Sequence, residues 1–497
     1  MTINYNELLK GLYGDHIAEV SKINLKYSLY EGQGQEWDTT SGLDYTPTKK
    51  ITNYIKKLVD TKARFMFGKE PFFDMSAVIE DAKGSIINED LTQEKEDLLA
   101  DILKKNKFHS KILKAKKDCS IGGRIAIKLW ASEKEGVKII FSPAQEFFAI
   151  YDMDDVDILQ KVIFLYQMNI EQSDEKQKVK KQEWEIKNDK CVLNEGIYDG
   201  KGRLIEEIYT DFDTKLDFIP IIIIQNGGLT GETNGVSDVD QIWQNQDAYN
   251  KLTSDDLDAL KFSLFPQYVS TDASEESLDK LEIAPGSLID LQSDTKQMGQ
   301  GKQARLEVLE TSFDYNAKFQ DTINRIKNDM YDMMDVPNVS LDQLKGLMTS
   351  GKSMRALYWG LIAVCEEDAT EWIPALEQMV EYIFRLVDVY NVYGMREVAK
   401  YETALEIVRT YPLQEDTDTQ KRVDMEEVTT EVRSRKSYMN KWGEYDDLDA
   451  ELEQIQLEKA MLQDSYSQDL DNNINENIED PDNIEDPEEN PEENPIE

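Results

Sequence analysis

The stretch SDVDQIWQNQDAYNKLTSDDLDAL, Ser237–Leu260, decides the fold, together with the residues that follow it. Its apolar residues recur at roughly helical spacing and Ser237 is a plausible N-cap, so a long helix is predicted. Residues 262–294 carry two strand-like runs, QYVST and GSLIDL, with prolines and a glycine at the turns. A second helical pattern covers about Gln303–Met334. The sequence therefore predicts a helical hairpin with a compact β module at its tip.

The residues before the hairpin mix helix and strand. Lys49–Phe67 predicts a helix that Gly68 ends, and Leu98–Lys117 predicts another with a basic outer face. From Gly122 onward, short runs rich in β-branched and aromatic residues alternate with Gly, Asn and Asp, until the apolar FIPIIII closes the region. These runs predict an antiparallel sheet. The fold class is therefore α+β.

The residues after the hairpin are mostly helical. Lys352–Tyr393 predicts one unusually long helix, bent at Pro374 and stopped by Gly394. Residues 400–463 predict a smaller helical unit. The tail from Asp464 holds 14 Asp or Glu, four Pro and no Lys or Arg. It repeats an imperfect IEDP motif and has no periodic apolar face, so it is predicted to be disordered.

The net charge of −43 over 497 residues limits the possible functions. Nucleic-acid affinity comes from Lys and Arg that neutralise phosphates, so the charge argues against a conventional nucleic-acid binder. The charge does not argue against a conduit through which DNA slides without adhering. The three cysteines follow no metal-binding spacing, and the longest apolar run, Phe218–Ile224, is too short to span a bilayer. An intracellular protein without metal or cofactor is expected.

One motif favours an enzyme. GLMTSGKS, Gly346–Ser353, matches the phosphate-binding pattern GxxxxGK[ST] at every fixed position. An ATPase would use Lys352 on the terminal phosphate and Ser353 on Mg²⁺. However, the preceding PNVSLDQLK does not read as the buried parallel strand that such a loop requires. A Gly/Ser-rich loop at a helix N-terminus is the alternative, and we expect no catalytic residues.

Other polar clusters also have a simpler interpretation. His16 and His109 are isolated, so no multi-histidine metal site is predicted. The carboxylate clusters are typical of a solvated surface in so acidic a chain. The basic stretch Lys104–Lys117 either contacts DNA or another anionic partner, or is a solvated helix face that pairs with acidic neighbours.

The order of these segments resembles the portal proteins of long-tailed phages, particularly those of Gram-positive hosts. The resemblance runs from about Lys49 to Leu462. It rests on four segments: Asn53–Phe73, the hairpin at 237–336, Ser350–Leu361 and Ser434–Ala460.

The resemblance implies a domain order, a set of partners and a location. The protein would form a ring, typically of twelve subunits, at one capsid vertex of the virion, after assembly in the host cytoplasm. It would nucleate procapsid assembly with the major capsid and scaffolding proteins, dock the large terminase subunit, and later carry head-completion and tail proteins. The implied parts are a wing (1–235), a first stem helix (236–261), a clip (262–302), a second stem helix (303–336), a tunnel loop (337–350), a wing-to-crown helix (351–394), a crown (395–463) and the acidic tail (464–497).

Both stem helices are rich in carboxylates, which suggests a negative channel wall along which double-stranded DNA slides. The tunnel loop would grip the DNA loosely. Candidates for the wall are Asp240, Asp247, Asp255, Asp258, Glu310, Asp314 and Asp321; candidates in the tunnel loop are Lys345, Gly346, Thr349, Ser350, Gly351 and Lys352. An acidic structural adaptor or scaffold without a channel remains the second alternative.

Overall fold

The computed structural model describes residues 8–9, 16–38, 45–77, 89–168, 178–264, 267–271, 273–274, 293, 304–309, 315–339, 351–413 and 417–430, with five isolated residues between 438 and 455. The chain divides into two compact units. One comprises residues 1–349 and 353–413, and the other residues 350–352 and 414–497. The four sheets formed by the described residues lie in the first unit, and helix α13 (Thr417–Thr429) lies in the second.

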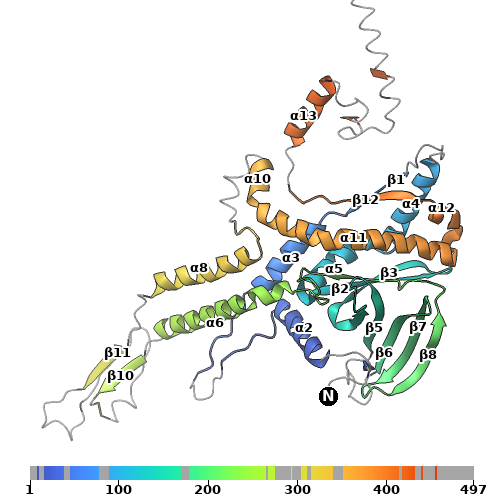
Figure 1. The fold of residues 1–497 in the computed structure, drawn as a ribbon. Helices are drawn as coiled ribbons and strands as arrows, with labels where there is room; N and C mark the ends of the chain where they lie inside the picture. Colours follow the sequence, from blue (N-terminus) through green and yellow to red (C-terminus); the bar gives the residue numbers. More distant parts are fainter. Residues whose placement is uncertain are drawn as a thin grey trace, which may run out of the picture. The chain divides into compact units, whose positions relative to one another are not determined.

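A three-stranded antiparallel sheet is at the centre of the first unit, in the order β3-β2-β9. Its strands are β2 (Arg124–Ser132), β3 (Gly136–Pro143) and β9 (Ile221–Gln225). Almost every residue of β2 is buried, as expected for a strand covered on both faces. On one face lie α5 (Phe108–Gly122) and α11 (Trp359–Tyr390), with α3 (Tyr54–Phe67) against both helices (Figure 1).

A five-stranded antiparallel sheet packs on the other face of β2. Trp130 of β2 meets Trp184 edge to face, and the Lys128 amine donates to Tyr166 and Gln182. The strand order is β4-β5-β6-β7-β8. The strands are β4 (Phe147–Tyr151), β5 (Leu159–Met168), β6 (Lys178–Lys187), β7 (Lys190–Asp199) and β8 (Leu204–Asp213). The predicted single antiparallel sheet is thus two stacked sheets.

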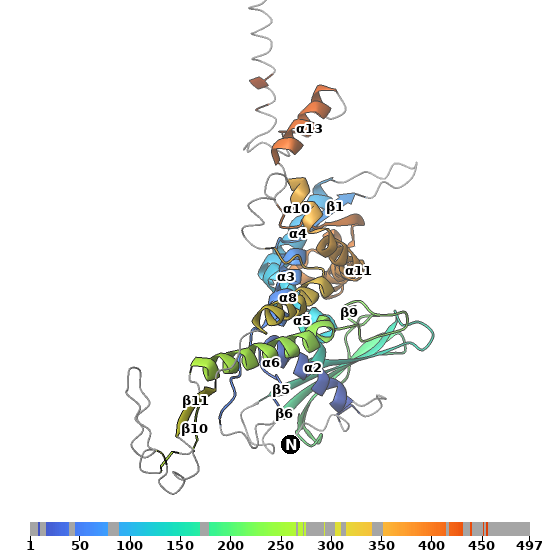
Figure 2. The ribbon, with the colours of Figure 1, turned by 90° about the vertical axis from the view of Figure 1, so that its left-hand side faces the viewer.

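The predicted hairpin is present. Helix α6 (Asp238–Leu264) runs out from the body, β10 (Gln267–Thr271) pairs with β11 (Arg305–Leu309), and α8 (Asn316–Met333) returns along α6 (Figure 2). The second helix was predicted to start at Gln303, which is wrong, because residues 305–309 alternate polar and apolar side chains and pair with β10. The predicted strand GSLIDL lies outside the described residues.

Two predicted helices near the N-terminus have different bounds. Helix α3 begins at Tyr54 rather than Lys49, because the Asn53 side chain caps it by accepting from the Lys56 amide. The predicted helix 98–117 is two helices, α4 (Glu89–Lys105) and α5. They break at Lys107, which is left-handed (φ 52°). Beside it, the Asn106 side chain binds the backbone of β3 at Val137 and Ile139 instead of facing solvent.

The region after the hairpin also differs from the prediction. The long helix is divided at Tyr358 into α10 (Gly351–Leu357) and α11. The latter continues through Pro374 and ends at left-handed Asn391, before the expected stop at Gly394. Residues 403–408, predicted as part of a helical unit, form β12, which pairs with β1 (Phe72–Ala77). Helix α12 (Arg396–Lys400) precedes β12. The acidic tail lies outside the described residues.

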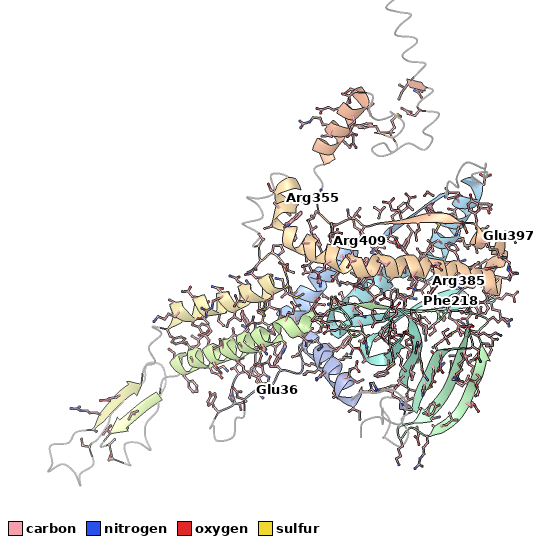
Figure 3. The ribbon with its side chains drawn as sticks, in the orientation of Figure 1. Glu36, Phe218, Arg355, Arg385, Glu397 and Arg409 are labelled. Atoms are coloured by element: carbon pink, nitrogen blue, oxygen red, sulfur yellow. The ribbon has the colours of Figure 1, made fainter. Side chains whose placement is uncertain are left out.

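Helix α11 is packed into the hydrophobic core by its buried apolar face, and two arginines add ion pairs to its neighbours (Figure 3). Arg385 binds Asp217 at 2.6 Å and lies over the ring of Phe218. Arg409 binds Glu366 at 2.9 Å. In the part of the chain that the structure describes, no helix is both long and apolar enough to cross a membrane. The three cysteines are free and buried.

Candidate functional site: the stem and its junction with the body

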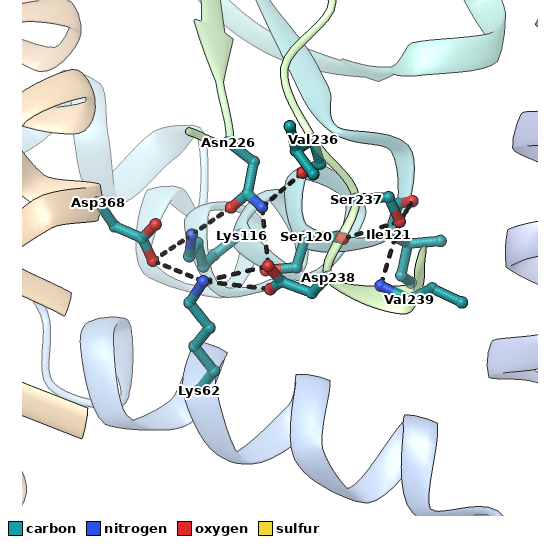
Figure 4. Close-up of polar contacts among 10 residues, drawn as sticks. All are labelled: Lys62, Lys116, Ser120, Ile121, Asn226, Val236, Ser237, Asp238, Val239 and Asp368. Atoms are coloured by element: carbon teal, nitrogen blue, oxygen red, sulfur yellow. Dashed lines mark hydrogen bonds and ion pairs between the residues drawn. The ribbon is translucent and has the colours of Figure 1, made fainter. Parts of the chain in front are cut away.

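Five buried polar side chains form a closed ring of contacts where the stem meets the body (Figure 4). The Lys116 amine lies 2.7 Å from Asp368 and donates to the Asn226 side chain at 3.0 Å. Asn226 donates to Asp238 at 2.9 Å. The Lys62 amine completes the ring, at 3.2 Å from both Asp238 and Asp368. The ring thus joins α3, α5, α6, α11 and the segment after β9.

This polar ring carries two positive and two negative charges away from water. Lys116 is 0% exposed, and no member exceeds the 8% of Asp368. Burial lowers the pKa of Lys62, but Asp238 and Asp368 outweigh it and raise that pKa above its usual value. Burial raises the pKa of Asp368, yet Lys116 and Lys62 hold it below its usual value. Each charge depends on its partners, because an unpaired charge at this depth costs several kcal/mol.

The start of α6 is fixed by backbone contacts beside the polar ring. Ser237 caps the helix as predicted, since its hydroxyl accepts from the Val239 amide at 3.2 Å and donates to the Ile121 carbonyl at 2.6 Å. Gly235 has φ +62°, and a Cβ there would lie 2.2 Å from the Gly123 carbonyl oxygen. Only glycine allows the two segments to approach so closely.

A polar ladder holds the segment 48–54 along α6. Side chains four residues apart on the helix bind backbone groups two residues apart on the segment. Four helix residues rise about 6.0 Å and two extended residues about 6.6 Å, so the two spacings match. The pairs are Gln246 with the Tyr54 amide (2.8 Å), Asn250 with the Thr52 amide (3.0 Å), Ser254 with the Lys50 amide (3.0 Å) and Asp258 with the Thr48 amide (2.8 Å).

The ladder residues are buried, with at most 6% of each residue exposed. The prediction of α6 rested on its apolar residues, yet Leu260 is 45% exposed. The signal that could have revealed the ladder is the polar repeat Gln246, Asn250, Ser254 and Asp258, at every fourth position.

The carboxylates proposed to line a channel have different environments. Asp258 is buried in the ladder, which leaves it almost no surface for a channel wall. Asp240 pairs with Lys26 at 2.7 Å and Asp247 with Lys251 at 3.0 Å. Asp255 and Asp321 are exposed. Burial, followed by the charges of Asp258 and Asp38, raises the pKa of Asp255. Glu310 and Asp314 lie outside the described residues.

The second stem helix is electrically balanced along its described length. Within α8, three cations accompany three carboxylates: Lys318, Arg325 and Lys327 with Asp321, Asp329 and Asp332. Of the three wall candidates predicted on this helix, Glu310 and Asp314 precede α8 and Asp321 lies within it. The stem is therefore less acidic than its carboxylates alone indicate.

Most of the tunnel-loop candidates lie outside the residues that the structure describes. Lys345, Gly346, Thr349 and Ser350 lie outside the described residues, while Gly351 and Lys352 begin α10. Residues 336–339, the last described before the GxxxxGK[ST] match, form no strand. Residues 340–345, which directly precede the match, lie outside the described residues.

The lysines of the basic stretch Lys104–Lys117 have three environments, one of which is that of half-buried Lys111, whose amine donates to the Ile139 carbonyl. Lys116 and Lys117 are bound inside the fold, by Asp368 and Asp60 respectively, each at 2.7 Å. Lys104, Lys105, Lys107 and Lys114 remain exposed. The pairing interpretation thus holds for the last two lysines, although Lys116 is buried rather than solvated.

The chain thus combines a layered α+β body with a helical hairpin that carries a β module at its tip. Residues 9–465 match the family model described as phage portal protein, SPP1 Gp6-like. The chain therefore belongs to this family of bacteriophage portal proteins, virion proteins of the head-to-tail connector that serve genome packaging. No curated protein matches the chain.

Proposed function

We propose that copies of this chain form a ring at the portal vertex, through whose central channel DNA enters and leaves the capsid. The observation that carries the proposal is the α6–α8 hairpin, fixed to the body by the polar ring, in a chain whose residues 9–465 match the portal family. A dodecamer is the expected assembly. The large terminase subunit, the major capsid and scaffolding proteins, and the head-completion adaptor are the proposed partners, and initiation of procapsid assembly is a proposed role.

The junction would transmit load between stem and body. Forces on DNA in the channel act on the hairpin, and the buried polar ring joins its base to α3, α5 and α11. Buried ion pairs are directional and lose several kcal/mol when one partner is displaced. This connection resists rotation of α6 more than apolar packing alone, which is non-directional.

The channel wall would be mixed in charge rather than strongly negative. Asp240, Asp247 and Asp258 are already bound by other groups, although Asp240 is exposed. Among the wall candidates in the described stem, Asp255 and Asp321 are exposed and have no ion pair with a described residue. Such a wall still offers few cations to phosphates, so DNA would slide with little adhesion. Lys345 and Lys352 remain the proposed loose grip in the tunnel loop.

Duplex DNA binding to the purified ring, measured by fluorescence anisotropy over a salt series, tests this proposal. We expect weak binding at physiological salt, with a shallow dependence on salt concentration. Tight binding with a steep slope would mean that many phosphates are neutralised, and a low-adhesion channel would be refuted. The Lys352→Ala variant tests the ATPase alternative, which requires ATP binding that this substitution abolishes; we expect no binding in either protein.

A further inference from the structure

A group of lysines on one edge of the body forms no ion pair with a carboxylate among the described residues. Burial raises the pKa of Asp118, one turn along α5 from Lys114, and the charge of Lys114 opposes that rise. Lys107, Lys111 and Lys114 recur at helical spacing along the start of α5. The Lys111 amine donates to the Ile139 carbonyl of β3, next to the exposed Lys138. Burial and then the charge of Lys138 lower the pKa of Lys111. This lysine patch, Lys107, Lys111, Lys114 and Lys138, is notable in a chain of charge −43.

An acidic surface lies at the other edge of the same sheet. Glu232, Asp335, Glu367 and Glu371 are exposed around a cavity of about 830 Å³, beside the segment that follows β9. No ion pair joins them to any residue for which the structure gives a position. The two buried carboxylates that also line this cavity are neutralised by Lys62 and Lys116. The four exposed carboxylates are not neutralised in this way by any described residue.

The lysine patch and this acidic surface lie diagonally across the three-stranded sheet. Strands β3 and β9 are its two edges, with β2 between them. Lys138 of β3 is opposite Trp130, toward the end of β2, whereas Gln225 of β9 is opposite Arg124, at its start. Helix α5 packs on β3 and β2, and α11 packs chiefly on β2 and β9. Two different complementary patches on separate sides of one subunit are what a head-to-tail ring requires.

We propose that the lysine patch of one copy docks on the acidic surface of the next copy, and that this contact joins neighbouring subunits in the ring. The proposal rests on the proposed function, in which the copies assemble. Copies that each carry a charge of −43 repel one another. The interface between two copies therefore needs lysines or arginines that form no ion pair within their own subunit. The lysine patch supplies such side chains. The exposed Ile140 beside Lys138 adds apolar area to the contact.

Charge reversal and charge exchange test the contact in the full chain, with native mass spectrometry as the readout of ring formation. One variant is Lys114→Glu with Lys138→Glu, and a second is Glu367→Lys with Glu371→Lys. The combined four-residue variant restores opposite charges across the interface and also returns the net charge to its original value. Lys22→Glu with Lys201→Glu is the matched control, because both lysines are exposed and their reversal changes the net charge equally.

We expect the ring fraction to fall by about tenfold or more in each two-residue variant, because like charges then face each other. It should recover in the combined variant and persist in the control, with equal melting temperatures throughout. Rings in the lysine variant at the control level, or no recovery in the combined variant, would overturn the proposal. So would a lysine variant that keeps its rings and loses duplex DNA binding, which would assign the patch to nucleic acid. If the unmodified chain forms no ring, the proposed function itself fails.

Discussion

Replacing Asp368 with asparagine removes one negative charge from the polar ring while keeping its shape. Asp368 lies 2.7 Å from the Lys116 amine and 3.2 Å from the Lys62 amine. After the substitution, Asp238 is the only carboxylate left in the polar ring, and it contacts Lys62 but not Lys116. Lys116, which is fully buried, retains only the neutral Asn226 oxygen as a partner.

The expected loss is about 3–5 kcal/mol in the free energy of unfolding, the usual cost of leaving one member of a buried ion pair uncompensated. The unit that contains the polar ring has about 400 residues. At roughly 2.1 cal/mol/K per residue, its unfolding entropy is about 0.8 kcal/mol/K. The melting temperature should therefore fall by about 4–6 °C.

Differential scanning calorimetry of Asp368→Asn measures this loss. Asp101→Asn is the matched control, because Asp101 is exposed and has no carboxylate-binding partner among the described residues; it should change stability by less than about 0.5 kcal/mol. The double variant Lys116→Met with Asp368→Leu removes a whole pair and leaves Lys62 with Asp238. It should recover much of the loss. Equal stability of Asp368→Asn and the control would refute the role given to the polar ring.

Three further predictions concern the same region. Gly235→Ala should lower the melting temperature of the first unit more than Gly231→Ala does. Both positions have positive φ, but a Cβ at Gly231 would meet nothing within 4 Å. Equal melting temperatures would contradict the close approach of Gly235 to the Gly123 carbonyl. Asn250→Ala should lower the free energy of unfolding by about 1–3 kcal/mol and speed hydrogen exchange at the Thr52 amide. The control, substitution of the exposed Gln244 by alanine, should do neither. An unchanged exchange rate at Thr52 in Asn250→Ala would argue against the ladder. Lys116 and Lys62 hold the pKa of the Asp368 carboxyl below 3.8 despite its burial. The stabilisation that the ionised carboxylate provides is therefore present in full above about pH 4 and is lost as the pH falls through the pKa of the folded state. The difference in melting temperature between the unmodified chain and Asp368→Asn should shrink below about pH 4, and a difference that stays constant with pH would contradict the charge assignment.

The hairpin could be predicted because its signals are local. Ser237 caps α6 through its own side chain, and a β run at the tip is bounded by turn residues. The predicted start of α8 is too early, because the alternation of polar and apolar residues over 305–309 is too short to exclude a helix. Only pairing with β10, far away in the sequence, makes them a strand. The break at Lys107 likewise depends on a distant contact, that of Asn106 with β3.

The polar ring could not be predicted from the sequence. Lys62, Lys116, Asn226, Asp238 and Asp368 are separated by up to 306 positions and lie in segments with many other charged residues. Nothing in the local pattern distinguishes Lys116 from the exposed Lys114, although one is buried and the other is not. The acidity of the stem was overstated for the same reason, because Lys26 and Thr48, which bind its carboxylates, come from distant segments.

Electron microscopy of the purified full chain tests the central claim most directly. The account predicts closed rings with an axial opening wide enough for duplex DNA and with the α6–α8 hairpins arranged around that opening. Monomers, open filaments, or rings whose hairpins point away from the axis would contradict it.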